Sequence, residues 1–174
     1  MQKRVAAYQG GVIMKLVITM SRRYGTGSTE IAQELAKRLN IPVYNKDIIG
    51  QEANERTYES EAEDIRRLAE SPCIILGRLA CEVLKDRLNV LNIFVSAEKD
   101  FRIHRIMESN SLGYEDAKAL VEKTDEARAD YYNKCTGRAW GDIADYHMIL
   151  DTAELGVDNC PDIIMQYLKL TEFI

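Results

Sequence analysis

The segment of residues 16–32, which reads LVITMSRRYGTGSTEIA, constrains the fold of this chain more than any other. It begins with an apolar, β-branched run that predicts a buried strand over Leu16 to Met20. A glycine-bearing turn follows, and then a helix over residues 27–39 whose apolar residues recur at helical spacing. In such a turn, backbone N–H groups point inward and the helix dipole adds positive potential. The segment therefore predicts a phosphate-binding loop between a strand and a helix.

The turn departs from the Walker pattern G-x-x-x-x-G-K-[ST]. Gly27 takes the second glycine and Thr29 the hydroxyl that contacts Mg²⁺. Arg22 stands at the first glycine and Ser28 at the lysine. Because the lysine charge on the β- and γ-phosphates is missing, we expect Arg22 and Arg23 to be the nearest substitutes. The alternative is a strand-to-helix turn without a ligand, since short glycine motifs also occur by chance.

Downstream of this loop, short β-branched runs alternate with longer segments of helical period, which is typical of βαβ units and a parallel sheet. The further predicted strands cover residues 41–44, 73–76, 90–95 and 146–150. The further predicted helices cover residues 99–109, 114–134 and 162–168. Five strands with intervening helices predict a three-layer α/β sandwich.

Length and net charge limit the classes of function that this chain can have. A chain of 174 residues fits one domain and is large enough to bury a core. A formal net charge of -5 argues against nonspecific binding to nucleic acid, which usually requires a basic face. No apolar run reaches the roughly 18 residues needed to span a bilayer. Residues 1–13 fit no part of the first strand, so we expect a leader segment there and a single domain over residues 14–174.

The four cysteines show no C-x-x-C pair and no metal-ligand spacing with either histidine. They are Cys73, Cys81, Cys135 and Cys160. This pattern favours buried, reduced thiols and a cytoplasmic location.

Two charged pairs lie in the predicted helices. Arg102 and Arg105 stand at i and i+3, so they share a helix face, which predicts an anion-binding site. The alternative is a solvated face on which they pair with neighbouring glutamates. Asp125 and Arg128 repeat the spacing, where an ordinary salt bridge is the simplest interpretation.

Four segments together carry a family resemblance. They are ITMSRRYGTGSTEIA at residues 18–32, NIPVYNKDII at 40–49, CIILGRLACEVL at 73–84, and residues 123–156 with TDEARADYY, TGRAWGD and ILDTAELG. In their order and spacing they resemble the cytidylate kinase-like family, a branch of the P-loop nucleoside monophosphate kinases. The resemblance implies an α/β, three-layer αβα P-loop NTPase fold with a parallel five-stranded sheet. It also implies phosphoryl transfer from ATP to a nucleoside monophosphate with Mg²⁺, and small nucleotides as partners.

The same resemblance assigns roles to individual residues. Gly25, Thr26, Gly27, Ser28 and Thr29 match the phosphate loop, with Thr29 toward Mg²⁺. Arg78 matches an arginine that holds the acceptor, and Arg102 and Arg105 match positions near a mobile lid. Asp125 and Arg128 match a D-x-x-R pair that contacts the acceptor or the transferring phosphate. Arg138 belongs to a lid-like tract at about residues 135–142 that includes Trp140, for which a structural turn is an equal alternative.

The resemblance is incomplete at three further places. Asn45 stands where the family tends to carry an aspartate, unless Asp47 substitutes for it. Leu79 replaces an aspartate that helps true cytidylate kinases to read the base. Residues 51–72 are shorter than the expected acceptor-binding segment, although an Ile65 to Leu68 stripe indicates a linker helix. The alternative to a nucleotide kinase is therefore a catalytically weak, nucleotide-binding regulatory protein. The identity of the acceptor, the choice of ATP or GTP, and the oligomeric state stay open.

Overall fold

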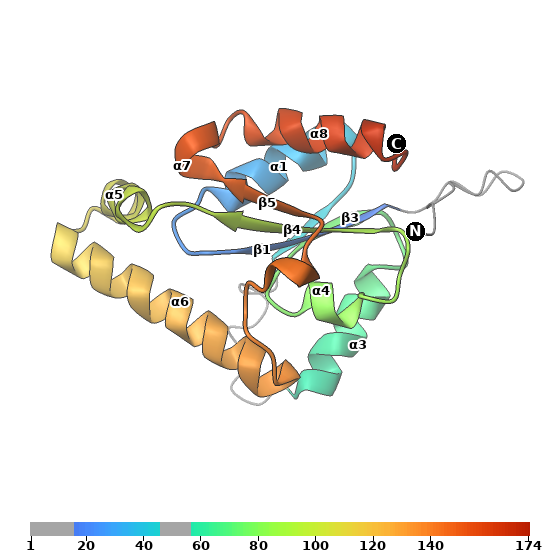
Figure 1. The fold of residues 1–174 in the computed structure, drawn as a ribbon, viewed down its shortest axis with the longest axis horizontal. Helices are drawn as coiled ribbons and strands as arrows, with labels where there is room; N and C mark the ends of the chain where they lie inside the picture. The colour runs from blue at the N-terminus through green and yellow to red at the C-terminus, as the bar shows by residue number, and fades with distance from the viewer. Residues whose placement is uncertain (1–15, 46–56) are drawn as a thin grey trace, which may run out of the picture.

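The computed structural model describes residues 16–45 and 57–174, which form a three-layer α/β domain (Figure 1). The middle layer is a five-stranded sheet in the order β2-β3-β1-β4-β5, in which every neighbouring pair is parallel. The strands are β1 (Val17–Arg22), β2 (Val43–Asn45), β3 (Cys73–Leu76), β4 (Val90–Ser96) and β5 (Met148–Asp151). This architecture confirms the predicted αβα P-loop fold.

Helices cover both faces of the sheet. On one face lie α1 (Ser28–Leu39), α7 (Thr152–Leu155) and α8 (Cys160–Leu170) (Figure 1). On the other lie α3 (Tyr58–Leu68), α4 (Ala80–Val83) and the short 3-10 helix η2 (Ile143–Asp145). The pair α5 (Lys99–Asn110) and α6 (Tyr114–Thr136) begins beyond the end of β4, and α6 then runs back along the second face.

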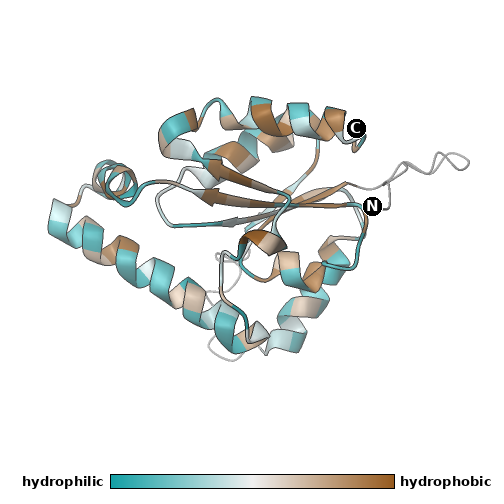
Figure 2. Cartoon of the chain, viewed as in Figure 1, coloured by the Kyte–Doolittle hydropathy of each residue, from teal (hydrophilic) through white to brown (hydrophobic). Residues whose placement is uncertain are grey.

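The core divides into two clusters because successive strand residues point to opposite faces of the sheet. Ile18 and Ile74 belong to the cluster beneath α1 and α8, whereas Val17 and Ile75 belong to the cluster on the α3 and α4 side. All four side chains are fully buried. In Figure 2 the strands are accordingly the most hydrophobic elements, and the outer helix faces are hydrophilic. Within the described ranges, no helix has both the length and the apolar character needed to cross a membrane.

A third apolar cluster joins α5 to α6. Ile103 and Ile106 of α5 pack against Ala117 and Val121 of α6. The two helices therefore form one packed hairpin, and this hairpin stands at the carboxyl end of the sheet, where open α/β sheets bind ligands.

Several element bounds differ from the predicted ones. The second strand begins at Val43 rather than at residue 41, after Pro42, which has no N–H to donate. The fifth begins at Met148, because Tyr146 ends η2 and packs in the core instead. The Ile65 to Leu68 stripe belongs to the longer helix α3, whose N-terminus is capped by the side chain of Thr57. Asp47, residues 1–13 and the first part of the 51–72 segment lie outside the described residues.

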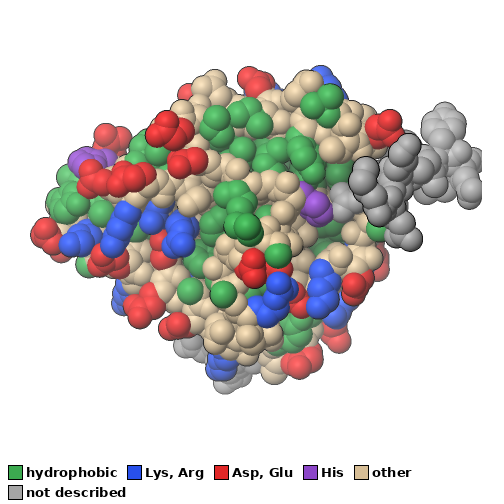
Figure 3. Space-filling view, in the orientation of Figure 1, with side chains coloured by type: hydrophobic (Ala, Val, Ile, Leu, Met, Phe, Trp, Pro, Cys, Tyr) green, Lys and Arg blue, Asp and Glu red, His purple; other side chains and the backbone are tan. Residues whose placement is uncertain are grey.

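Basic and acidic side chains alternate on the face shown in Figure 3, most densely around α5. Hydrophobic side chains also reach the surface there, and Ile143 of η2 and Ile149 of β5 are 74% and 46% exposed. The surface on this side of the molecule is therefore mixed in charge rather than basic.

Candidate active site

The predicted phosphate loop connects β1 to α1. The residues between Arg22 and Ser28 turn sharply because Gly25 and Gly27 adopt positive φ angles of 82° and 78°. The hydroxyl of Thr26 donates a hydrogen bond of 3.0 Å to the Arg23 carbonyl and closes the turn. The N-terminus of α1 thus opens directly onto the loop, which is the arrangement that favours anions.

Both glycines are also required by close packing. A Cβ atom at Gly25 would lie 2.8 Å from the backbone oxygen of Arg102, and one at Gly27 would lie 2.6 Å from Cγ2 of Val157. The loop is therefore confined between α5 on one side and the segment that links α7 to α8 on the other.

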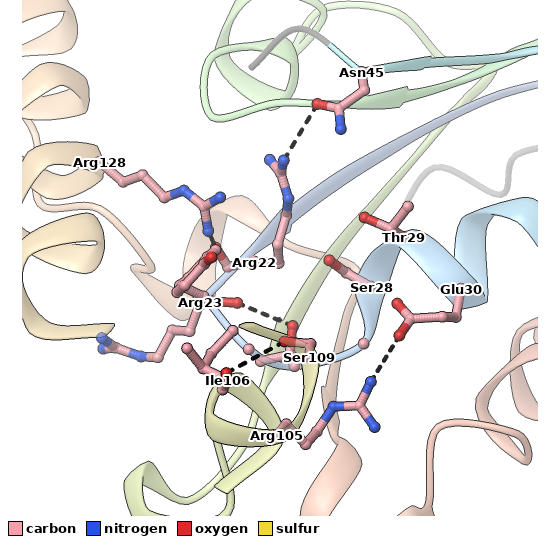
Figure 4. Close-up of a pocket in the computed structure, with 14 residues that line it drawn as sticks. Arg22, Arg23, Ser28, Thr29, Glu30, Asn45, Arg105, Ile106, Ser109 and Arg128 are labelled. Atoms are coloured by element: carbon pink, nitrogen blue, oxygen red, sulfur yellow. Dashed lines mark hydrogen bonds and ion pairs between the residues drawn. The ribbon is translucent and has the colours of Figure 1, made fainter. Parts of the chain in front are cut away.

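A cavity of about 280 Å³ lies against this loop (Figure 4). Asn45 at the end of β2, Arg105 and Ser109 of α5, and Arg128 of α6 form its other walls. The predicted site residues that line it are Arg22, Arg23, Gly25, Thr26, Gly27, Ser28, Thr29, Arg105 and Arg128. The structure thus brings together residues that are far apart in sequence.

The basic side chains among the described residues that line this cavity are all arginines. Arg22 is only 5% exposed, its Nη2 lies 3.5 Å from Oδ1 of Asn45, and its carbonyl accepts a 2.9 Å hydrogen bond from Arg128. Arg105 reaches across from α5 and donates to Glu30 of α1 at 2.7 Å. Guanidinium groups bind phosphate oxygens through two parallel N–H donors, so this set suits a polyphosphate.

Arg102 and Asp125 lie outside the cavity lining. They form an ion pair of 2.7 Å, and their side chains are 5% and 12% exposed. Both also bond to the backbone of Tyr24 in the phosphate loop. Their predicted spacing on the helices is correct, but the side chains contact the loop instead of facing the cavity.

Arg78 lies after β3 and likewise outside the cavity lining. Its guanidinium carbon stacks 4.0 Å from the ring centroid of Tyr131, whose hydroxyl donates to Glu61 of α3. Burial, and next the bond to Glu61, raise the pKa of Tyr131 above its usual range, so this phenol stays neutral. Leu79 is fully buried in the core. The position at which the family has a base-reading aspartate therefore carries an inward-facing leucine.

Arg138 is also placed away from the phosphate loop. Its guanidinium pairs with Glu82 of α4 at 3.1 Å and with Asp145 of η2. The hydrogen bond from Lys85 is the largest effect on the pKa of Glu82 and lowers it. Burial opposes this shift, and the contact with Arg138 adds to it. The Trp140 ring packs edge-on against Phe94 of β4, with ring centroids 5.4 Å apart. Residues 138–140 are thus tied to the α4 side of the sheet, and Arg138 lines a separate cavity of about 230 Å³ there.

Five cavity residues were not among the predicted site residues: Tyr24, Glu30, Asn45, Ile106 and Ser109. Tyr24 lies within the predicted loop, and Asn45 was noted only as a departure from the family. Glu30 directly follows the predicted loop, so its adjacency to Thr29 was an available signal. Ile106 and Ser109 line the cavity from α5, but only the packing of that helix brings them there.

The residues present fit a magnesium ion held mainly by nucleotide phosphates. Thr29 is exposed in the first turn of α1, and it lines the cavity. Among the residues that the structure describes, no group of three or more His, Cys, Asp or Glu side chains gathers as a metal site. Mg²⁺ in phosphoryl-transfer sites keeps several waters and takes few protein ligands besides the phosphates, so a single hydroxyl is compatible.

Curated proteins named cytidylate kinase are similar to this chain over most of its length. The protein named cytidylate kinase from Pyrobaculum islandicum is 23% identical over 171 residues, covering 88% of this chain and 92% of its own. The one from Methanothermobacter thermautotrophicus is 28% identical over 155 residues, covering 79% of this chain and 95% of its own.

Solved structures give the same result for the fold. An uncharacterized protein from Eubacterium ventriosum superposes with a TM-score of 0.80 at 27% identity, covering 89% of this chain and 98% of that one. Shikimate kinase from Bacteroides thetaiotaomicron superposes with a TM-score of 0.60 at 16% identity, covering 88% and 98%, which shows a shared fold alone. The profile of the cytidylate kinase-like family matches residues 17–61 and 50–154, most of the described domain. The chain therefore belongs to the cytidylate kinase-like family.

Proposed function

We propose that this nucleotide kinase transfers the γ-phosphoryl group of Mg²⁺·ATP to a nucleoside monophosphate, and that the cavity beside residues 23–29 is where the reaction takes place. The observation that carries the proposal is the convergence of Arg22, Arg105 and Arg128 on a glycine loop at a helix N-terminus. Such a site offers charge neutralisation and positioning, which are what phosphoryl transfer needs from a protein.

The loop and α1 supply the donor side. Backbone N–H groups of the loop and the first turn of α1 bind the donor phosphates, and the Thr29 hydroxyl is placed to contact Mg²⁺. The chemistry that Mg²⁺ would supply here is neutralisation of part of the phosphate charge, with Thr29 as its protein ligand. Arg105, which reaches over Gly27, would leave Glu30 and donate to the same phosphates.

Arg128 and Arg78 supply the acceptor side, and Arg22 lies beside Arg128. The acceptor oxygen belongs to a phosphate that is already ionised at neutral pH, so no general base is needed. Arg128 donates a hydrogen bond to the Arg22 carbonyl, which fixes the direction of the Arg128 guanidinium, and the Arg22 guanidinium is held by Asn45. Arg78, stacked on Tyr131, is the further cation near the end of β3. Together they would orient the acceptor in line with the donor.

Two observations bear on which base the acceptor carries. Relatives named cytidylate kinase make CMP the first acceptor to test. Because Leu79 is buried, however, no carboxylate is available at that position to bind a cytosine amino group. We therefore expect weaker discrimination among pyrimidine nucleotides than an aspartate at this position would give.

The test is an assay of ADP formation with Mg²⁺·ATP and CMP, dCMP, UMP, AMP or GMP, with ATP binding measured in parallel by thermal shift. Turnover with one acceptor supports the proposal and names the substrate. Arg128→Met should then lower kcat/KM by about 10²-fold or more. The matched control is Arg87→Met, because Arg87 bonds to the Ala69 carbonyl at the other end of the sheet and should leave kcat/KM unchanged.

A regulatory nucleotide-binding protein is the second candidate. Two observations favour it: Ser28 takes the place of the Walker lysine, and Glu30 already occupies Arg105. This candidate predicts a thermal shift with ATP and no turnover with any acceptor. The absence of both signals would exclude a nucleotide site in this cavity.

A further inference from the structure

The buried Arg102 of α5 and the partly buried Asp125 of α6 form a pair that touches the phosphate loop from outside the cavity. The Arg102 Nη1 lies 2.7 Å from the Asp125 Oδ2. A further hydrogen bond, 3.1 Å from the Arg102 Nε to the carbonyl of Ala97, fixes the guanidinium to the segment that links β4 to α5. Because neither side chain lines the cavity, the pair reaches a bound nucleotide only through what it holds.

The pair holds the backbone of Tyr24, and Oδ2 of Asp125 also lies 3.6 Å from Nη1 of Arg23, which lines the cavity. The Oδ1 atom of Asp125 accepts a 2.8 Å hydrogen bond from the Tyr24 N–H, and the Nη1 atom of Arg102 donates a 3.0 Å hydrogen bond to the Tyr24 carbonyl. The peptide groups on both sides of one residue are therefore fixed by two side chains that are also fixed to each other. The next residue is Gly25, where the loop takes its first positive φ angle.

We propose that Arg102 and Asp125 are positioning residues that set the conformation of the phosphate loop by holding both peptide groups of Tyr24. The inference rests on the proposed function, because it assigns this loop to the donor phosphates. A loop without the Walker lysine depends on its backbone donors to place those phosphates. Misplacing reacting groups by about 1 Å can cost about 10²-fold in rate, so the held backbone has a direct catalytic consequence.

The spacing of residues along α5 and α6 explains why each helix contacts both the loop backbone and the cavity. One turn beyond Arg102, Arg105 faces the cavity, and one turn beyond Asp125, Arg128 does the same. Each helix thus sends one side chain to the loop backbone and one guanidinium to the cavity. Because Ile103 and Ile106 bind α5 to α6, loop and arginines are held in one packed unit.

The first test is Asp125→Asn, which keeps an oxygen for the Tyr24 N–H but removes the charge that faces Arg102. We expect the KM for ATP to rise by about 10- to 100-fold and kcat to fall, while the acceptor KM at saturating ATP stays unchanged. Glu126→Gln is the matched control, because Glu126 has the same charge on the same helix but is exposed. Unchanged kinetics in Asp125→Asn, or equal losses for both substrates, would overturn the proposal.

A double-mutant cycle tests whether the pair acts as a unit. Arg102→Met leaves the Asp125 charge with only the 3.6 Å contact to Arg23, whereas in the double variant neither member of the pair carries a charge. We expect the double variant to lose no more ATP affinity than the worse single variant, and Arg102→Lys to recover part of it. Fully additive losses would contradict the proposal.

A measurement on the unmutated protein keeps the test independent of folding and of turnover. Amide hydrogen exchange of Tyr24 in the nucleotide-free protein should be slow, because its N–H is bonded to a buried carboxylate. Exchange at the rate of a solvent-exposed loop amide would overturn the proposal even if the protein is an active kinase. Absence of turnover with every acceptor would instead refute the proposed function, and ATP affinity would then replace KM in the variants.

Discussion

Gly27→Ala should destabilise the fold for two reasons, an unfavourable backbone conformation and a steric clash. The positive φ of 78° at Gly27 disfavours any side chain, at about 1–2 kcal/mol for an L-residue. In addition, the new Cβ would lie 2.6 Å and 2.9 Å from the two methyl carbons of Val157, a contact that real Cβ atoms do not make. Forcing atoms into packed space costs about 1–3 kcal/mol more. We therefore expect Gly27→Ala to lower the free energy of unfolding by about 2–5 kcal/mol.

Gly137→Ala provides the matched control. Gly137 ends α6 with a positive φ of 70°, and a Cβ there would meet nothing within 4 Å. This variant therefore carries the backbone cost of about 1–2 kcal/mol without the clash. The difference between the two variants measures the contact with Val157.

The assay is urea denaturation of both glycine variants in the native background and in a Val157→Ala background. Val157→Ala removes the two methyl groups that the new Cβ in Gly27→Ala would strike, so the difference between the glycine variants should fall to within about 0.5 kcal/mol. If Gly27→Ala costs no more than Gly137→Ala in the native background, the close approach of Val157 to the loop is refuted. If the difference persists without the methyl groups, another contact causes it.

Three further predictions concern charge and thiols. Glu30→Gln should lower the KM for ATP several-fold, since it frees Arg105 and removes a negative charge beside the phosphates; an unchanged or higher KM would show that the ion pair does not compete with the donor. Arg138→Met should lower the melting temperature and leave the KM for ATP unchanged, because Arg138 pairs with Glu82 and Asp145 outside the cavity. A raised KM for ATP would show that Arg138 contributes to donor binding. In a thiol titration of the folded protein, Cys135 should react first, since it is the partly exposed cysteine. Burial raises the pKa of the Cys73 thiol to about 11, so Cys73 should react only in urea. Equal reaction rates of the two thiols in the folded protein would contradict the burial of Cys73.

The strands and the phosphate loop were predictable because their signals are local. Three short apolar runs become β1, β3 and β4, which are buried on both faces, and a central strand of a parallel sheet needs little more than such a run. The edge strands were placed less accurately. β2 and β5 are short and partly exposed, so local turn geometry at Pro42 and Tyr146 decides where they begin.

The sequence by itself determined the parts of the site that are contiguous. Residues 22–29 predict a glycine turn followed by a helix start, because the positive φ angles of Gly25 and Gly27 are a local preference of glycine. The i,i+3 spacing of Arg102 with Arg105, and of Asp125 with Arg128, likewise follows from helix geometry alone.

Only the tertiary structure decided which member of each pair faces the cavity. The apolar contacts between α5 and α6 set the rotation of the two helices, which turns Arg105 and Arg128 toward the cavity and Arg102 and Asp125 toward the loop backbone. The placement of Arg138 was decided in the same way, by the two carboxylates that pair with it on the α4 side. Spacing fixes which residues share a helix face, but the direction of that face depends on packing partners that are distant in the chain.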